Sequence, residues 1–273
     1  MSVLLHLSDT HFGTERTPVL DALVLLSQQQ APDLLVLSGD ITQRASRAQF
    51  AAAKAFFLRL KTPLLAIAGN HDIPLFNLWQ RLRQPYARYS EAFGMTLAPW
   101  HVSPNWLVLC VNTSRWYRHK GGAVSAEQIE QVVASLRSAR LEQLRVVVVH
   151  QPIAVLSTHE RHNLLDGHAA AQHAWAAAGC DLVLGGHIHL PYVKALDGLA
   201  RPMWAVQAGT AASKRVRDGA PNSVNLLRWA GQTPQRGCQV EQWDYSAAAQ
   251  SFVCSHVTTL YPARTENMDG YRQ

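Results

Sequence analysis

Short apolar segments that end abruptly in aspartate, asparagine or histidine are the feature that most constrains how this 273-residue chain can fold. Five such segments occur, and they lead into Asp9-Thr10-His11, Gly39-Asp40, Gly69-Asn70-His71-Asp72, His150 and Gly186-His187-Ile188-His189. Short apolar segments bounded by turn residues are typical of buried strands. Because ligands bind at the carboxyl ends of parallel strands, we expect these polar residues to gather in one site.

Segments with helical periodicity separate the predicted strands. Apolar residues recur at helical spacing in residues 18–30 and 45–60, and helices are also predicted at 125–140 and 168–178. The strands that alternate with them are predicted at 3–7, 34–38, 64–68, 106–111, 146–149 and 182–184. This alternation indicates βαβ units and a largely parallel sheet.

The pattern changes twice along the chain. Residues 73–100 are rich in aromatic and basic side chains and are predicted to form a cap of short helices over the site. After residue 191 only strands are predicted, at 202–208, 223–229, 240–245 and 251–257. We expect these strands to form a second, antiparallel sheet packed on the first within a single domain, residues 1–261. The polar tail, residues 262–273, is expected to be flexible.

Composition excludes several classes of protein. Hydrophobic residues make up 48% of the chain and charged residues 16%, which is typical of a folded globular protein rather than a disordered one. No transmembrane segment or signal peptide is predicted, and the four cysteines lack the close spacing of a zinc or redox motif. These features predict a cytoplasmic protein. The net charge of +6 favours an anionic partner.

The polar residues after the strands have the chemistry of metal ligands. Their carboxylate, amide and imidazole groups suit Mn, Fe, Zn or Co, whereas Ca and Mg sites are dominated by oxygen and structural Zn sites by cysteine. The candidate ligands are Asp9, His11, Asp40, Asn70, His150, His187 and His189. Seven ligands exceed the need of one four-coordinate ion, so the sequence predicts two ions that share a carboxylate. Asp40, which stands alone at its strand end, is the predicted bridge.

These motifs resemble those of the calcineurin-like metallophosphoesterase family in order, residue type and position after strands, over residues 9–189. The segment Leu4-Leu5-His6-Leu7-Ser8-Asp9-Thr10-His11-Phe12-Gly13 is similar to the start of bacterial class III cyclic nucleotide phosphodiesterases. The resemblance implies a four-layered α/β/β/α sandwich, in which two mixed sheets are flanked by helices. It also implies two metal ions, Mn or Fe being the expected ions and Zn or Co the alternatives.

The resemblance assigns a role to each residue. One metal would be held by Asp9, His11, Asp40 and His189, and the other by Asp40, Asn70, His150 and His187. A hydroxide that bridges the two ions would attack phosphorus in line. His71 would face the leaving group as general acid or charge stabiliser, and Asp72 would orient His71. The alternative for Asp72 is a helix N-cap. Gln151 departs from the pattern, because many relatives have histidine there.

Two further loops resemble segments near the substrate pocket of the class III phosphodiesterases. They are Arg118-His119-Lys120-Gly121-Gly122 and the stretch from His159 through Asn163 to Gly167. On this resemblance, His119, His159 and Asn163 are candidate substrate contacts.

The function predicted from these residues is hydrolysis of a small phosphodiester, a cyclic nucleotide of the 3′,5′-cAMP type. One alternative is a UDP-2,3-diacylglucosamine pyrophosphatase, for which basic and aromatic residues would provide peripheral contact with a membrane. Phe12 stands against it, because those enzymes usually have leucine after Asp-x-His. A broad phosphodiesterase or nuclease is another alternative, although no stable nucleic-acid partner is predicted. A catalytically silent binding module normally lacks ligands, and none is missing here. The resemblance also implies a homodimer.

Overall fold

The first half of the chain forms a parallel βαβαβ unit. Strands β1 (Ser2–Leu7), β2 (Leu34–Leu37) and β3 (Leu64–Ala66) pair in parallel, and helices α1 (Thr17–Gln30) and α2 (Arg47–Arg59) connect them. The computed structural model describes residues 1–231 and 237–263. Side chains alternate along β1, so that Leu5 and Leu7 pack with the helices, whereas Leu4 faces the other way. The strands and helices predicted for this half are confirmed to within two residues at either end.

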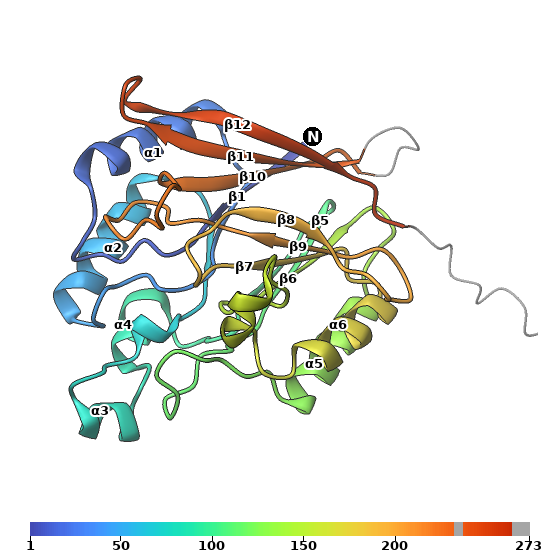
Figure 1. The fold of residues 1–273 in the computed structure, drawn as a ribbon, viewed down its shortest axis with the longest axis horizontal. Helices are drawn as coiled ribbons and strands as arrows, with labels where there is room; N and C mark the ends of the chain where they lie inside the picture. Colours follow the sequence, from blue (N-terminus) through green and yellow to red (C-terminus); the bar gives the residue numbers. More distant parts are fainter. Residues whose placement is uncertain (232–236, 264–273) are drawn as a thin grey trace, which may run out of the picture.

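A second parallel unit follows. Strands β5 (Trp106–Cys110), β6 (Leu144–Val148) and β7 (Leu182–Gly185) pair in parallel, with α5 (Ala126–Arg137) and α6 (His168–Ala177) on one face (Figure 1). Ser125 caps α5, because its side chain accepts a hydrogen bond from the backbone N–H of Gln128.

The last strands do not form a separate antiparallel sheet, so that prediction is wrong. Strands β10 (Ser223–Trp229), β11 (Cys238–Ser246) and β12 (Ser251–Leu260) extend the first sheet, where β10 pairs antiparallel with β1. Strand β9 (Trp204–Gln207) pairs parallel with β7 in the second sheet. Both β1 and β7 would otherwise expose an unpaired edge, and the late strands cover these edges.

Two short strands were not predicted. Strand β8 (Tyr192–Ala195) pairs with β9 at one edge of the second sheet, and β4 (Trp100–Val102) pairs with β5 at the other. The segment between β3 and β4 contains α3 (Leu78–Arg83) and α4 (Ala87–Phe93), as predicted. Helix α4 is anchored through the buried Tyr89, whose hydroxyl donates to the carbonyl of Ala66. Helix α3 has no buried residue.

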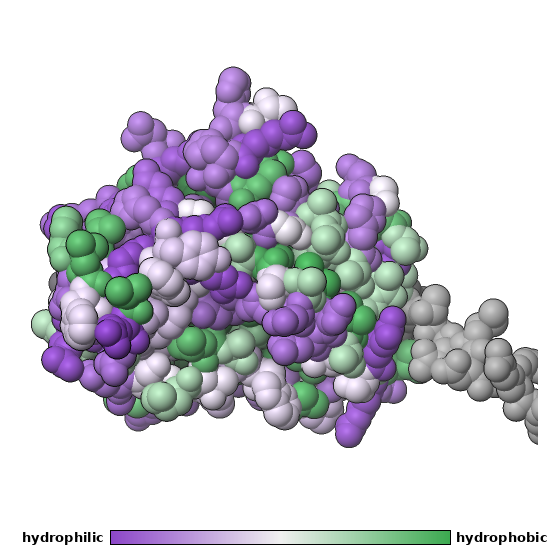
Figure 2. All heavy atoms as spheres, turned by 90° about the horizontal axis from the view of Figure 1, so that it is seen from below, coloured by the Kyte–Doolittle hydropathy of each residue, from purple (hydrophilic) through white to green (hydrophobic). Residues whose placement is uncertain are grey.

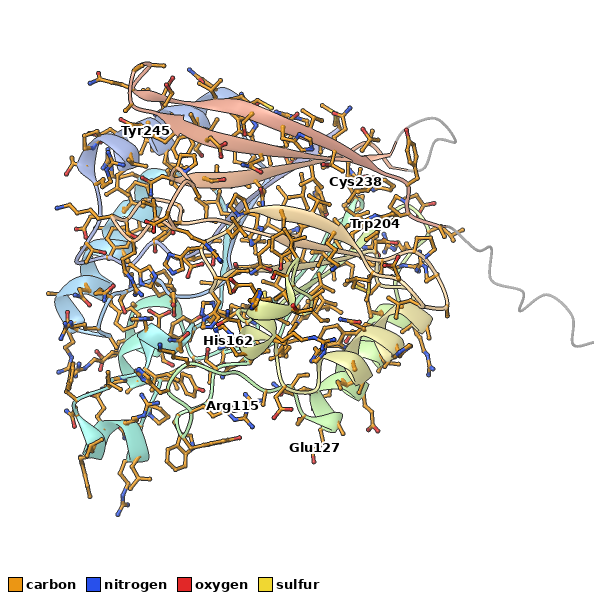
Figure 3. The ribbon with its side chains drawn as sticks, in the orientation of Figure 1. Arg115, Glu127, His162, Trp204, Cys238 and Tyr245 are labelled. Atoms are coloured by element: carbon orange, nitrogen blue, oxygen red, sulfur yellow. The ribbon has the colours of Figure 1, made fainter. Side chains whose placement is uncertain are left out.

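Three apolar clusters separate the four layers. One lies between α1, α2 and the first sheet, and another between α5, α6 and the second sheet. The third lies between the sheets, where Leu4 and Val36 pack with Val108 and Val146. Trp204 and Cys238, labelled in Figure 3, belong to this layer and come from different sheets. Complete burial of one large apolar side chain in these clusters contributes about 1.5–3 kcal/mol to folding. The predicted α/β/β/α sandwich is confirmed.

Two further sequence predictions concern the C-terminal tail and membrane-spanning segments. From residue 264 onwards the predicted flexible tail lies outside the described residues. Among the helices that are described, none is both long enough and apolar enough to cross a membrane.

Candidate metal centre

The turns that follow the strands have an uncommon backbone conformation. Within residues 1–231 and 237–263, nine residues other than glycine have a positive φ, and five of them are predicted ligands. These are Asp9 (54°), His11 (40°), Asp40 (50°), His187 (76°) and His189 (59°). The left-handed conformation is tolerated best by Asn, Asp and His, and it concentrates at functional sites. The turns therefore point several polar side chains toward one place at a cost in backbone strain.

Two glycines allow these turns to approach each other. A Cβ at Gly69 would overlap the backbone nitrogen and the carboxylate of Asp40. A Cβ at Gly186 would overlap the hydroxyl of Ser8 and approach the carboxylate of Asp9. The glycine in each motif is thus required where one strand end packs against another.

A first cluster joins the end of β1 to the end of β7. The Nε2 atom of His189 lies 3.4 Å from Oδ1 of Asp9 and 3.4 Å from Nε2 of His11. The Nε2 atom of His11 lies 3.7 Å from Oδ1 of Asp9. Ligand atoms that bind one ion at about 2.0–2.2 Å lie roughly 3–4 Å from one another. The cluster therefore has the spacing of a metal site.

A second cluster joins the ends of β2, β3, β6 and β7. The Nε2 atom of His150 lies 3.3 Å from Oδ1 of Asp40 and 3.2 Å from Oδ1 of Asn70. His187 offers a ligand atom within 4.8 Å of those of Asp40 and His150. The other carboxylate oxygen of Asp40, Oδ2, lies 3.8 Å from Nε2 of His11 in the first cluster. Asp40 thus faces both clusters, as the predicted bridge requires.

Two buried polar atoms support the assignment to metal ions. Oδ1 of Asp9 and Nδ1 of His187 have no hydrogen-bond partner in the part of the chain that is described. A buried polar atom without a partner is costly, and an ion would satisfy both atoms. The mixture of carboxylate, amide and imidazole donors suits Mn, Fe, Zn or Co. The residues present therefore fit two metal ions.

Hydrogen bonds fix the tautomers of two imidazoles. The Nδ1 atom of His150 donates to the carbonyl of Ser38 at 2.8 Å. The Nδ1 atom of His189 contacts the carbonyl of Arg215, and it lies 2.7 Å from the hydroxyl of Thr210. Because a carbonyl only accepts, the proton is on Nδ1 in each ring. The Nε2 atoms are left free to bind a metal.

The electrostatics of the site favour ligands in their deprotonated forms. Burial raises the pKa of Asp9 and Asp40, but the surrounding histidines outweigh it and hold both pKa values below the ordinary range. Burial lowers the pKa of His11 and, with the charge of His150, lowers that of His187 to about 4. Metal binding requires these forms.

His150 is the exception. Burial lowers its pKa, but the charge and the hydrogen bond of Asp40 raise it to about 9. The protonated His150 thus places a positive charge next to Asp40, and a metal ion bound between Asp40 and His150 would replace that proton.

His71 lies beside the two clusters. Its backbone N–H donates to Oδ1 of Asp40 at 2.8 Å, and its ring is perpendicular to that of His11 with centroids 4.9 Å apart. Its Nδ1 atom donates to the carbonyl of Gln43 at 2.9 Å. Its Nε2 atom is 3.0 Å from Nη1 of Arg215. The ring is therefore held by its neighbours in a position facing the centre.

The expected pairing of Asp72 with His71 is not found, and this prediction is wrong. The buried carboxylate of Asp72 instead accepts hydrogen bonds from the backbone N–H groups of Ile41, Thr42 and Gly69, and from the hydroxyl of Thr42. Four donors take up the carboxylate and hold the end of β2 against the turn after β3. Asp72 thus acts on the shape of the ligand turns, in a manner closer to the capping alternative.

A cavity of about 430 Å³ opens beside the first cluster, and only one of the three predicted substrate contacts lines it. It is lined by Glu160, Asn163, Ile188, His189, Arg215, Val216 and Arg217. Asn163 is therefore brought to the site, on the short 3₁₀ helix Thr158–Asn163 that carries His162 in Figure 3. His119 and His159 are exposed and are not among the lining residues.

The sequence analysis missed three residues of this cavity. Arg217 and Glu160 form an ion pair at 2.5 Å, and Asn163 donates to Glu160 at 2.7 Å. Arg215 reaches the metal centre from a loop far downstream of the ligand motifs. For the two arginines the available signal was the basic run Lys214-Arg215-Val216-Arg217 shortly after a predicted strand, and for Glu160 it was the position beside His159 in the loop already noted.

Gln151 replaces the histidine that the resemblance led us to expect. It is buried, and its side-chain oxygen accepts a hydrogen bond from the hydroxyl of Thr113 at 2.7 Å. Its Nε2 atom donates to the carbonyl of Lys120 at 3.4 Å. Arg115, in the same loop (Figure 3), donates to Asn112 and Gln128. Gln151 therefore supports the loop that carries His119.

Comparison with known proteins agrees with this geometry. The model of the calcineurin-like phosphoesterase family matches residues 2–191. A protein of Synechococcus sp. described as a probable cyclic nucleotide phosphodiesterase is 26% identical over 185 residues, which cover 67% of this chain and 68% of that protein.

Two solved structures share the fold. A dimetal phosphatase from Danio rerio has a TM-score of 0.66 at 13% identity, and the match covers 88% of this chain and 95% of that one. A purple acid phosphatase from yellow lupin (Lupinus luteus) seeds has a TM-score of 0.66 at 10% identity, covering 94% of this chain and 53% of the other.

Proposed function

The chain belongs to the calcineurin-like phosphoesterase family and is a metal-dependent phosphoester hydrolase, and we propose that it hydrolyses a cyclic nucleotide of the 3′,5′-cAMP type. The observation that carries a two-metal phosphodiesterase is the position of Asp40, whose two carboxylate oxygens face two separate ligand clusters. The resemblance to a probable cyclic nucleotide phosphodiesterase supports the choice of substrate.

The seven ligands divide between two ions in this proposal. One ion would be held by Asp9, His11, Asp40 and His189, and the other by Asp40, Asn70, His150 and His187. Two ions in such a site lower the pKa of a water molecule and neutralise charge on the phosphate. Mn and Fe are the ions we propose, following the family resemblance, and the mixed imidazole and carboxylate donors suit them as well as Zn or Co.

The remaining residues would act on the organic part of the substrate. His71 faces the centre and is proposed to stabilise or protonate the leaving oxygen. Asn163 and the ion pair of Glu160 with Arg217 line the adjoining cavity, which is polar enough for a sugar or a base. A single ring-closed nucleotide would fit a cavity of this size.

A substrate panel tests the proposal. Purified protein loaded with Mn²⁺ would be assayed with 3′,5′-cAMP, 2′,3′-cAMP and bis-(p-nitrophenyl) phosphate, using Asp40→Asn and His71→Ala as controls. We expect hydrolysis of cAMP and of the artificial diester, and large losses in both variants. Cleavage of the artificial diester without cleavage of either cyclic nucleotide would refute the choice of substrate. Full activity of Asp40→Asn would refute the site.

A second candidate is hydrolysis of a phosphodiester or pyrophosphate at a membrane surface. Helix α3 and the residues before it expose Phe76 (74%), Leu78 (72%) and Trp79 (70%). Figure 2 shows this apolar surface gathered at one end of the molecule. Between residues 73 and 124 there are six basic residues and one acidic residue, Glu91; the basic residues are Arg81, Arg83, Arg88, Arg115, Arg118 and Lys120. Apolar and basic groups together favour binding to anionic lipid.

Vesicle sedimentation separates the two candidates. If the substrate lies in a membrane, the protein should co-sediment with vesicles of anionic phosphatidylglycerol but not with vesicles of phosphatidylcholine. Trp79→Ala should weaken this binding, whereas Leu58→Ala, which truncates an exposed leucine on α2, should not. Equal recovery in the supernatant with both kinds of vesicle would exclude the membrane candidate.

A further inference from the structure

Arg215 brings a positive charge into the metal centre without a carboxylate partner. Its Nη1 atom lies 3.0 Å from Nε2 of His71, 3.2 Å from Oε1 of Gln43 and 3.4 Å from Nδ1 of His11. No carboxylate in residues 1–231 or 237–263 lies within ion-pair distance of its guanidinium. Arg217, two residues further on, is paired with Glu160. Two arginines of one loop therefore have different surroundings.

The partners of Arg215 leave most of its hydrogen-bonding capacity free. A guanidinium has five N–H donors, and only Nη1 of Arg215 donates to another side chain in the described structure. All three of these acceptors are neutral groups or imidazoles. Since charge-assisted bonds to carboxylate or phosphate are about twice as strong as neutral ones, a partly buried arginine with this environment is suited to an anionic ligand.

The backbone of the same loop fixes where Arg215 lies. Its carbonyl accepts from the hydroxyl of Thr210 at 2.8 Å, and its N–H donates to the hydroxyl of Ser213 at 3.2 Å. The N–H of Lys214 donates to the carbonyl of Thr14 at 2.9 Å, which ties the loop to the turn after β1. The same Arg215 carbonyl contacts Nδ1 of the predicted ligand His189. The side chain therefore starts from a fixed point beside the ligands.

We propose that Arg215 is a catalytic residue that binds a non-bridging phosphoryl oxygen of the substrate, between the metal ligands and His71. The inference rests on the proposed function of the site as a phosphodiesterase, but it does not depend on which alcohol the phosphate esterifies. The guanidinium stabilises the negative charge that grows on the phosphoryl oxygens during displacement. Loss of one such preorganised donor costs on the order of 10²–10³ in kcat.

The test compares Arg215→Ala and Arg215→Lys with Lys214→Ala, which removes one exposed positive charge from the neighbouring position. Three properties are measured on each metal-loaded protein: bound metal, binding of inorganic phosphate by calorimetry, and kcat and KM for bis-(p-nitrophenyl) phosphate. We expect Arg215→Ala to keep its metal and melting temperature but to bind phosphate at least 10-fold more weakly and to lose about 10²–10³ in kcat. Arg215→Lys should recover part of both losses, and Lys214→Ala should match the wild type.

A second measurement separates direct binding from support of His71. Added guanidinium ion should restore part of the activity of Arg215→Ala, because it can occupy the vacated position, and it should have no such effect on His71→Ala. Wild-type phosphate affinity in Arg215→Ala would overturn the proposal, and so would a loss of phosphate binding that follows a loss of bound metal. If the wild type cleaves the artificial diester but no cyclic nucleotide, the proposed substrate is wrong. The proposed role of Arg215 is then still decided by the phosphate binding and the kcat of its variants.

Discussion

The two sheets end at the same edge of the molecule but contribute different kinds of ligand. The first sheet supplies Asp9, Asp40 and Asn70, which would bind through oxygen, together with His11. The second sheet supplies only imidazoles, namely His150, His187 and His189. Each ligand cluster takes residues from both sheets. The negative charge of the site therefore lies on one side, and both ions would connect the two sheets.

The ligands should also differ in how many ions they hold. Asp40 is the one carboxylate whose oxygens face both clusters. Each imidazole of the second sheet belongs to one cluster. Substitution of Asp40 should therefore affect both ions, whereas substitution of a ligand that belongs to one cluster, such as each imidazole of the second sheet, should affect one.

The largest effect is expected for Asp40→Asn. The amide keeps the shape of the carboxylate but removes the charge that both ions share, so the bound metal should fall from two ions toward none. We expect a loss of more than about 10²-fold in kcat, because even residues that only support a ligand cost 10–100-fold. Metal analysis and steady-state kinetics check this. His187→Ala is the comparison, and it should retain one ion. Equal metal loss in the two variants would contradict the distinction between the shared carboxylate Asp40 and a ligand of one cluster.

Removal of the ions should lower stability, since each ion connects one sheet to the other. Mn²⁺ at 100 times its dissociation constant stabilises the folded protein by about 2.7 kcal/mol if it does not bind the unfolded chain. That corresponds to roughly 5–10 °C in melting temperature for a domain of this size. Calorimetry of chelated and reloaded protein measures the change. An unchanged melting temperature would mean that the ligands are not held across the sheets.

A smaller effect is expected from a residue that only positions a ligand. Thr210→Val removes the hydroxyl that lies 2.7 Å from Nδ1 of His189. We expect about 10–100-fold weaker binding of one ion, with the other unchanged. Titration of the chelated variant with Mn²⁺ should resolve two affinities that differ more than in the wild type. Parallel weakening of both sites would contradict the division of ligands.

The smallest effects should come from the residues around the cavity. Asn163 lines it, so Asn163→Ala should raise KM several-fold for a nucleotide substrate while kcat changes little. His119 and His159 are exposed outside the lining, so their alanine variants should remain within about twofold of the wild type. A large effect of His159→Ala on KM would show that the loop moves onto the substrate.

The strand ends could be predicted because local sequence determines them. Apolar segments followed by Asp9, Asp40 and Asn70 define both the strand and its carboxyl end, and parallel strands then bring those ends together. The α/β/β/α sandwich was implied by the family resemblance, whereas the strand pattern alone led to the separate antiparallel sheet that the structure does not have. The pairing of β10 with β1 could not be predicted, because strands of similar apolar character can cover either free edge, and only tertiary packing selects one.

The rest of the site depends on contacts between distant loops. Arg215 follows no strand-end motif, and its place beside His71 is set by backbone bonds from Thr210 and to Ser213. The family resemblance implies that Asp72 orients His71. Adjacent residues in a tight turn point in different directions, and the Asp72 carboxylate turned to the N–H groups of the next strand end.

Anomalous X-ray diffraction from crystals of the Mn²⁺-loaded protein tests the central claim most directly. The account predicts two manganese peaks about 3.5–4 Å apart, with one oxygen of Asp40 between them or one on each. Asp9, His11 and His189 should surround one peak, and Asn70, His150 and His187 the other. A single peak, or two peaks that Asp40 does not contact, would contradict it.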